Sequence, residues 1–173
     1  MASSVSTPDQ AMAAAGRGAI RWLWLSAAVV VLDHLTKWLA TQYLSYAEPV
    51  TLLPVFDLTL LHNTGAAFSF LASAGGWQRW FFALVALGVS GYLVHWLWRT
   101  PPQQRWIACA LALILGGALG NLIDRVLLGY VVDFISLHWQ HYYYPAFNIA
   151  DSAICVGAVM LLWDMFRPSA SQP

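Results

Sequence analysis

The hydrophobic and polar positions divide the chain into long apolar runs and more polar connections. Four runs approach the ~20 residues that an α-helix needs to cross a bilayer. We therefore predict four transmembrane helices, at residues 22–39, 80–98, 106–128 and 149–166. Within the connections, VTLLPVFDLTLLHN has the residue types and partial alternation of strands, and GYVVDFI is typical of a short strand or an interfacial loop. The pattern predicts a mainly α membrane protein.

The first apolar run follows Arg17 and Arg21, as the apolar part of a secretory signal would. It continues through Asp33 and Lys37 without a small-residue cleavage site, so we interpret it as a retained membrane anchor. The small and polar residues before it predict a disordered cytoplasmic tail over residues 1–20. The rest of the chain is then one membrane-embedded domain that ends at residue 168, followed by a short cytoplasmic tail.

Composition supports a membrane protein and limits its partners. Hydrophobic residues make up 60% of the chain and charged residues 9%, and the formal net charge of zero gives no reason to expect a nucleic acid. Most Lys and Arg residues flank the chain ends and the short second connection, whereas the long connections, residues 43–78 and 129–148, have none. By the positive-inside rule, we expect both termini in the cytoplasm and both long connections outside.

Several polar residues of the predicted spans fall at one depth. At a rise of ~1.5 Å per residue, Asp33, Lys37, Asn121, Asp124 and Asp151 lie roughly 18 to 28 Å from the cytoplasmic ends of their helices. That is the outer third of a hydrocarbon core ~30 Å thick. An unpaired carboxylate there costs ~2.5 kcal/mol or more. Their convergence indicates a site that faces the outer surface.

Some of these residues have a simple structural interpretation. Asp33 and Lys37 are one helical turn apart and can neutralise each other, which we favour over a catalytic role. Asn121, Asp124 and Arg125 share a helix face, and we again favour an internally satisfied cluster. The small residues of GGALG, just before Asn121, predict close helix packing.

Asp133 and Asp151 differ, because neither has a basic residue nearby in the sequence. Asp151 is close to a helix N-terminus, where the helix dipole favours an ionised carboxylate. Asp133 lies among Val, Phe and Ile, which favour the protonated form. Two carboxylates in different environments could share a proton, one as base and one as acid. On these residues alone, a helix cap at Asp151 and a loop carboxylate at Asp133 explain the pattern equally well.

Other chemistries find less support. His138 and His141 could bind a metal, but no clear third ligand accompanies them and HExxH is absent, so we favour an interfacial aromatic belt. Ser152 has no base placed to activate it. Cys109 and Cys155 lie at different depths, so we expect no disulfide.

Four motifs on the predicted spans and their connections carry a family resemblance. NTGAAFSFL from Asn63, GGALGNLIDR from Gly116, GYVVDFI from Gly129 and FNIADSAI from Phe147 closely resemble the lipoprotein signal peptidases, also called signal peptidase II. The resemblance implies an aspartic endopeptidase of the bacterial inner membrane, which removes the signal peptide of prolipoproteins just before a diacylglyceryl-modified cysteine. It also implies a four-helix bundle with a small outward-facing β-sheet platform between the first two helices.

The resemblance assigns residues and partners as well. It implies that Asp133 and Asp151 are the catalytic pair, without a metal or a cofactor. Polar positions that frame the family's site are matched by Asn63, Gly65, Asn121, Asp124, Arg125, Asn148, Asp33 and Lys37. The substrate would be a diacylglyceryl prolipoprotein beside membrane lipid, with no nucleic acid and no obligate protein partner. The stretch SAGGWQRW before the second span would hinge a lid.

Two residues depart from the family pattern. His34 stands where Gln is expected, and His62 where Arg or Tyr is more familiar. Neither belongs to the carboxylate pair, so the departures concern substrate detail. In the mechanism that we favour, the two carboxylates hold one water: the ionised partner removes its proton, and the protonated partner donates to the scissile carbonyl.

Two alternatives belong to other classes of protein. A proton- or ion-conducting bundle could use the same polar layer, but it needs polar residues through the full depth, which the inner halves lack. A structural assembly subunit would need the carboxylates for stability and not for chemistry.

Overall fold

Four long helices dominate the computed structural model, which describes residues 18–65 and 76–166. All four are long and apolar enough to cross a membrane, which confirms the predicted spans, with their ends shifted by about one turn or less. The helical elements are η1 (Ala19–Trp22), α2 (Leu23–Tyr43), α3 (Trp77–Arg99), α4 (Arg105–Leu127) and α5 (Ile149–Phe166).

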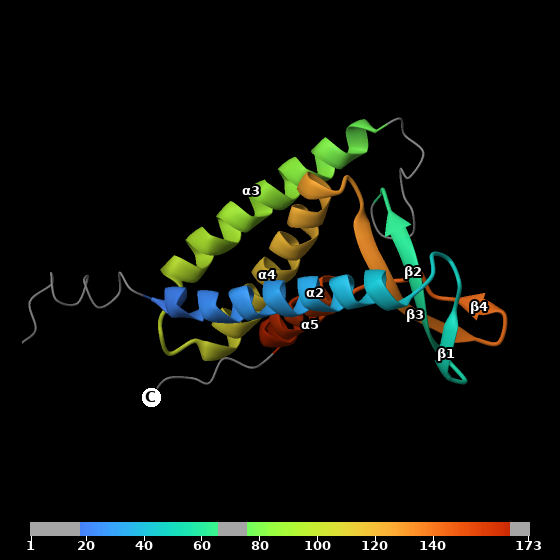
Figure 1. Ribbon diagram of the computed structural model, residues 1–173. Coiled ribbons are helices and arrows are strands. Elements are labelled where there is room, and N and C mark those ends of the chain that lie inside the picture. The colour runs from blue at the N-terminus through green and yellow to red at the C-terminus, as the bar shows by residue number, and fades with distance from the viewer. Residues whose placement is uncertain (1–17, 66–75, 167–173) are drawn as a thin grey trace, which may run out of the picture.

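A small antiparallel sheet stands at one end of the helices, opposite η1 (Figure 1). Its strands are β1 (Val50–Leu53), β2 (Phe56–Asn63), β3 (Val131–Trp139) and β4 (Tyr142–Tyr143), in the spatial order β1-β2-β3-β4. Both strand predictions are confirmed, but β3 and β4 follow α4, so the platform is not built between the first two helices alone. A two-stranded ribbon is marginally stable, and pairing with β3 gives β2 a partner on its second edge.

Helix α4 packs against the other three helices. Glycines on α4 allow the close approach: a Cβ at Gly116 would meet Ser26 and Val29 of α2, and a Cβ at Gly117 would clash with the backbone of Ala150 on α5. The close helix packing predicted from GGALG is thus confirmed.

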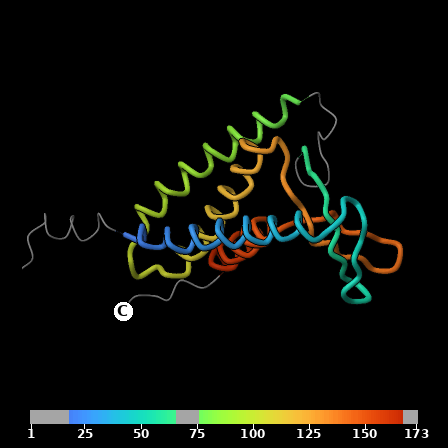
Figure 2. The backbone as a smooth tube through the Cα atoms, in the orientation of Figure 1, coloured from blue at the N-terminus to red at the C-terminus, as the bar shows by residue number. Residues whose placement is uncertain are grey.

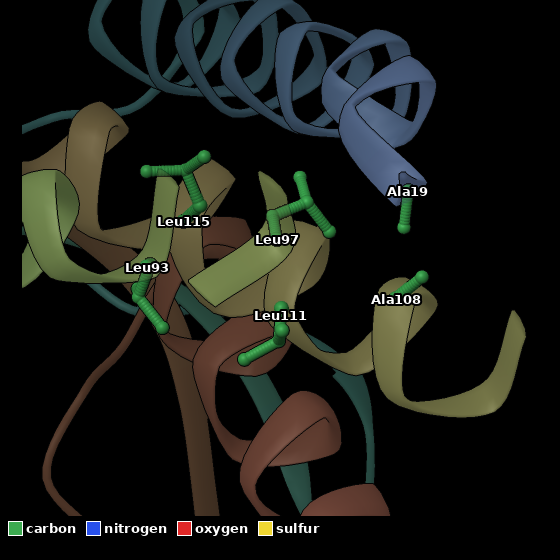
Figure 3. Close-up of a cluster of buried hydrophobic side chains, with 6 residues drawn as sticks. All are labelled: Ala19, Leu93, Leu97, Ala108, Leu111 and Leu115. Carbon is green, nitrogen blue, oxygen red and sulfur yellow. The ribbon is translucent and has the colours of Figure 1, made fainter. Parts of the chain in front are cut away.

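Two apolar clusters hold the bundle and the sheet. The first lies away from the sheet, and its buried members are Ala19, Leu93, Leu97, Ala108, Leu111 and Leu115 (Figure 3). This cluster offers no polar side chain to an ion, which argues against a conducting path among η1, α3 and α4. The second cluster joins Ala40 of α2 to Leu60, Val132 and Phe134 of the sheet, so the sheet is packed directly onto the helices.

Parts of the predictions lie outside the described residues. These are the tails over residues 1–17 and 167–173 and the start of the proposed lid hinge, residues 73–75, whereas residues 77–80 of that stretch form the first turn of α3. The division into one domain and two tails stays a prediction. Cys109 and Cys155 are both free thiols, as expected.

Candidate active site

Asp133 and Asp151 are brought together by the pairing of β3 with Phe147, two residues before the start of α5. Figure 2 follows the chain from the end of α4 through the long segment of β3 and back to the start of α5. There Phe147 donates its N–H to the Ile135 carbonyl at 3.0 Å and accepts from the N–H groups of Phe134 and Ile135 at 3.1 and 2.9 Å. These backbone hydrogen bonds place the first turn of α5 beside Asp133, although Asp133 and Asp151 belong to different elements of the chain.

Asn148 connects the two carboxylates. Its side-chain amide donates to Asp133 Oδ1 at 2.8 Å, and its side-chain oxygen accepts the Asp151 N–H at 2.9 Å. Asp151 Oδ2 accepts the Asn148 N–H in return, at 3.4 Å, which forms a reciprocal cap on α5. Asn148 is fully buried. Asp151 therefore takes part in a helix cap, which was one of the two interpretations of this residue from the sequence. The same carboxylate is also close enough to Asp133 to affect its charge.

Asp133 is a buried carboxyl group with two amide donors. Asn63 Nδ2 donates to its Oδ2 at 3.0 Å, opposite the bond from Asn148, and the residue is only 3% exposed. Burial, followed by the neighbouring charge of Asp151, raises the pKa of Asp133 to about 7, despite the lowering effect of both amides. The prediction that its surroundings favour the protonated form is consistent with this pKa.

Asp151 has a second amide partner in the membrane-spanning helices. Asn121 Nδ2 donates to Asp151 Oδ1 at 2.7 Å, and Asn121 Oδ1 accepts from Lys37 Nζ at 2.9 Å. Asn121 therefore links the carboxylate to a buried cation that belongs to another helix.

Lys37 is the centre of a buried ion cluster. Its Nζ lies 2.7 Å from Asp33 Oδ2 and 2.8 Å from Asp124 Oδ2. Asp33 also accepts the Ala150 N–H at 2.9 Å, and Asp124 accepts the Val132 N–H at 3.2 Å. The predicted ion pair and the polar cluster on α4 are confirmed, and together they hold the starts of α5 and β3 in place.

Arg125 and Gly65, which belong to the predicted site, lie at the edge of this cluster. Arg125 donates from Nη2 to the Gly65 carbonyl at 3.1 Å and from Nη1 to the Asn121 carbonyl at 3.2 Å. It thereby fixes the chain just after Asn63, the residue that binds Asp133. His34 lies with Nδ1 3.5 Å from Asp124 Oδ1, so this departure from the family pattern touches the ion cluster.

Two cavities meet at the carboxylates. The sheet cavity, about 660 Å³, is lined by residues of β2, β3 and β4, by the connection between α2 and β1, and by the chain before α5, among them Tyr46, Thr59, His62, Asn63, Asp133 and Tyr143. The helix cavity, about 550 Å³, follows α4 and α5 and is lined by residues that include Asn63, Asn121, Arg125, Asp151, Ile154 and Val156. Asn63 and Tyr144 line both cavities. A chain that passes from one cavity to the other would cross the carboxylate pair.

His138, one of the two histidines considered as metal ligands, pairs with a carboxylate and a tyrosine. His138 Nε2 lies 3.3 Å from Asp57 Oδ2, and its ring stacks on Tyr143 at 5.0 Å. Across residues 18–65 and 76–166, no group of three or more His, Cys, Asp or Glu is arranged to hold a metal. The sequence analysis missed the pairing of His138 with Asp57, because only the register of β2 with β3 brings them together.

The role of Tyr144 was also missed. Tyr142, Tyr143 and Tyr144 follow one another and are all exposed, as expected of an aromatic belt. Tyr144 nevertheless lines both cavities beside the carboxylates. Its place just before the FNIAD motif was the available signal.

The arrangement suits acid–base chemistry on a chain held across the carboxylate pair. One carboxyl group titrates near neutral pH, and the other caps a helix and is bound by amides. Both are reachable from a cavity, and neither forms an ion pair within the described part of the chain.

Comparisons with known proteins agree with these features. The profile of the family described as signal peptidase (SPase) II, Peptidase_A8, matches residues 25–167. A lipoprotein signal peptidase of Pseudomonas putida is 56% identical over 92% of this chain and 95% of its own length. One from Acinetobacter baumannii is 57% identical, over 88% of this chain and 86% of its own.

A solved structure described as a bacterial membrane enzyme has the same fold. It superposes with a TM-score of 0.78 at 28% identity and covers 88% of this chain and 92% of its own. The motifs, the four spans and the sheet thus agree with a match that runs through nearly the whole transmembrane part. This chain is therefore a membrane peptidase that belongs to the signal peptidase II family.

Proposed function

We propose that the chain cleaves the signal peptide from diacylglyceryl-modified prolipoproteins just before the lipidated cysteine, with Asp133 and Asp151 as the catalytic pair. The observation that carries this assignment is the junction of two cavities at two carboxyl groups that both accept hydrogen bonds from Asn148. The relatives named lipoprotein signal peptidase support the choice of substrate.

In the proposed mechanism, the pair holds one water molecule. Asp151 is the base: the helix dipole and the N–H groups donated by Asn121 and Asn148 favour its ionised form, and it removes the proton of the water. Asp133, whose pKa lies near 7, is the acid and donates to the oxygen of the scissile carbonyl. The tetrahedral intermediate then collapses: Asp151 donates the proton that it took from the water to the amine of the cysteine, Asp133 takes a proton back from a hydroxyl group of the intermediate, and the C–N bond breaks. The roles of base and acid are therefore reversed in this second step, because the first step leaves Asp151 protonated and Asp133 ionised.

The lipid part of the substrate would bind from the helix cavity. Ile154, Cys155 and Val156 of α5 line that cavity beyond Asp151. Each methylene of an acyl chain that leaves water contributes ~0.8 kcal/mol, so two chains offer more binding energy than a short peptide.

The direct test is cleavage by the purified protein. In detergent, it should cut a precursor with a diacylglyceryl cysteine and leave the same precursor without lipid intact. Thorough chelation should leave the rate unchanged, because the carboxyl pair needs no Lewis acid. No cleavage of the lipidated precursor would contradict the proposal, and a strict zinc requirement would contradict the mechanism.

The rate should depend on pH near neutrality. Asp133 must carry a proton to act as the acid, and its pKa is about 7. Below this pH the group is protonated. As pH rises through 7, it ionises beside Asp151, and kcat/KM should fall about tenfold per pH unit. A pH profile of initial rates measures this fall, and a flat profile from pH 7 to 9 would remove Asp133 from the role of acid.

The carboxylate pair should face the periplasmic side of the inner membrane, with both termini in the cytoplasm. In a variant without Cys109 and Cys155, a cysteine introduced at Gln140, in the turn between β3 and β4, should react with an impermeant thiol reagent on intact spheroplasts. A cysteine at Gln103, between α3 and α4, should react only after the membrane is opened. The reverse labelling would place the site in the cytoplasm, where exported precursors do not present their cleavage sites.

A further inference from the structure

The cleavage chemistry of the carboxylate pair does not determine which part of the substrate lies in the sheet cavity. The helix cavity extends along the transmembrane helices and is lined beyond Asp151 by Ile154 and Val156. The sheet cavity instead extends over the sheet, and its lining includes the polar side chains of Thr59 and Ser136. The two cavities thus offer different chemistry on the two sides of one cleavage site.

The order of groups in the substrate decides which part enters which cavity. The signal peptide precedes the scissile bond and is an apolar membrane segment, and the acyl chains of the cysteine also belong in the bilayer. Both are suited to the helix cavity. The polypeptide after the cysteine must leave the membrane, and it carries peptide N–H and C=O groups that need polar partners. The helix cavity carries its polar side chains around the carboxylate pair, such as Asn121, Arg125 and Asp151, whereas the sheet cavity offers such partners away from the pair as well, at Thr59 and Ser136.

His62 is a polar side chain of this wall whose ring is held by aromatic neighbours. Its ring lies between two tyrosines, 4.0 Å from the ring of Tyr130 and 4.9 Å from that of Tyr46. These contacts fix the plane of the imidazole, while the residue remains exposed to the cavity. Asn63, the next residue along β2, binds Asp133. The plane of the imidazole is therefore fixed. His62 directly precedes Asn63, which donates a hydrogen bond to Asp133 of the carboxylate pair.

The state of the ring suits peptide binding. Partial burial lowers the pKa of His62 below its ordinary value, so the ring is neutral at neutral pH. A neutral imidazole has one N–H donor and one acceptor nitrogen, which match the C=O and N–H groups of a polypeptide. Within residues 18–65 and 76–166, no side chain or backbone group is hydrogen-bonded to this ring, so both nitrogens are available.

We propose that the sheet cavity binds the residues that follow the lipidated cysteine, and that His62 is a specificity-determining residue that hydrogen-bonds this segment. The inference rests on the proposed function, because it assumes that the carboxylate pair cleaves just before that cysteine. It assigns to the sheet platform a substrate segment that the cleavage reaction itself does not require.

Two lipidated precursors test the assignment. The long precursor carries six residues after the cysteine, and the short one ends at the cysteine as an amide. On the long precursor, His62→Ala should lower kcat/KM roughly five- to tenfold, mainly through KM, because one or two hydrogen bonds are lost. On the short precursor it should match the wild type, which also shows that the variant is folded. His62→Gln keeps a donor and an acceptor and should recover part of the loss.

A matched control and a reference variant make the outcome decisive. His141→Ala removes an exposed histidine from the same sheet, in the turn outside both cavity linings, and should cleave both precursors like the wild type. An equal loss on both precursors, or no loss on either, would overturn the role of His62. Asp151→Asn should cleave neither precursor. If it cleaves them, the proposed function fails, whatever the result at His62.

Discussion

Asp133→Asn and Asp151→Asn should each lower the rate of cleavage of a lipidated precursor by about 10³-fold or more. Asparagine keeps the shape of the side chain and one acceptor oxygen, so each variant keeps one of the two N–H bonds that the carboxylate accepts, and the fold should survive. It cannot exchange a proton with the water or with the scissile carbonyl. The measurement is the single-turnover rate of the purified variants, with thermal unfolding in detergent as the check on folding.

Asp164→Asn is the matched control, because Asp164 lies on α5 near the end opposite Asp151. It should cleave like the wild type. Residual activity of more than a few per cent in either Asp133→Asn or Asp151→Asn, in a folded protein, would rule out the pair as the catalytic groups. Full activity in both would support the structural assembly alternative, in which the carboxylates serve stability alone.

Lys37→Met should unfold the protein at a markedly lower temperature, with a loss of about 3–5 kcal/mol in the free energy of unfolding. Lys37 is 3% exposed and is the cation between the buried carboxylates of Asp33 and Asp124. Methionine fills similar space but leaves both charges without their partner. Because these carboxylates hold the starts of α5 and β3, cleavage should fall as well.

A second substitution separates charge from packing in this variant. Adding Asp124→Asn to Lys37→Met removes one of the two uncompensated charges, so thermal unfolding should return part of the way towards the wild type. If Lys37→Met unfolds with the wild type, the cluster does not carry the stability that its geometry implies. If the double variant is less stable than the single one, Asp124 matters through its bond to Val132 and not through charge.

The spans could be predicted because their signal is local. An apolar run of about 20 residues has one stable conformation in a bilayer, since each backbone N–H must bond within the helix. The depth of Asp33, Lys37, Asn121 and Asp124 followed from the same geometry, because a helix converts sequence position into height. Their convergence in one cluster therefore needed only the predicted orientations of the spans.

The sheet was less accessible to sequence reasoning. The strand character of β2 and of GYVVDFI was visible, but strand pairing depends on partners that are distant in the chain. The register of β2 with β3 pairs Leu61 with Asp133 and Asp57 with Ser136. No local pattern specifies this register, so the Asp57–His138 contact and the pairing of β3 with β2 in one sheet were not foreseen.

The sequence by itself therefore determined the four spans, their polar layer and, through its motifs, the family. Tertiary structure decided how Asp133 and Asp151 meet. Their positions depend on the backbone hydrogen bonds between Phe147 and β3 and on three side-chain amides from separate elements, those of Asn63, Asn121 and Asn148. It also decided that the capping carboxylate of α5 and the strand carboxylate share one junction of two cavities. The physical reason is that helix formation and membrane depth depend on neighbouring residues, whereas the environment of a buried carboxyl group depends on every element packed around it.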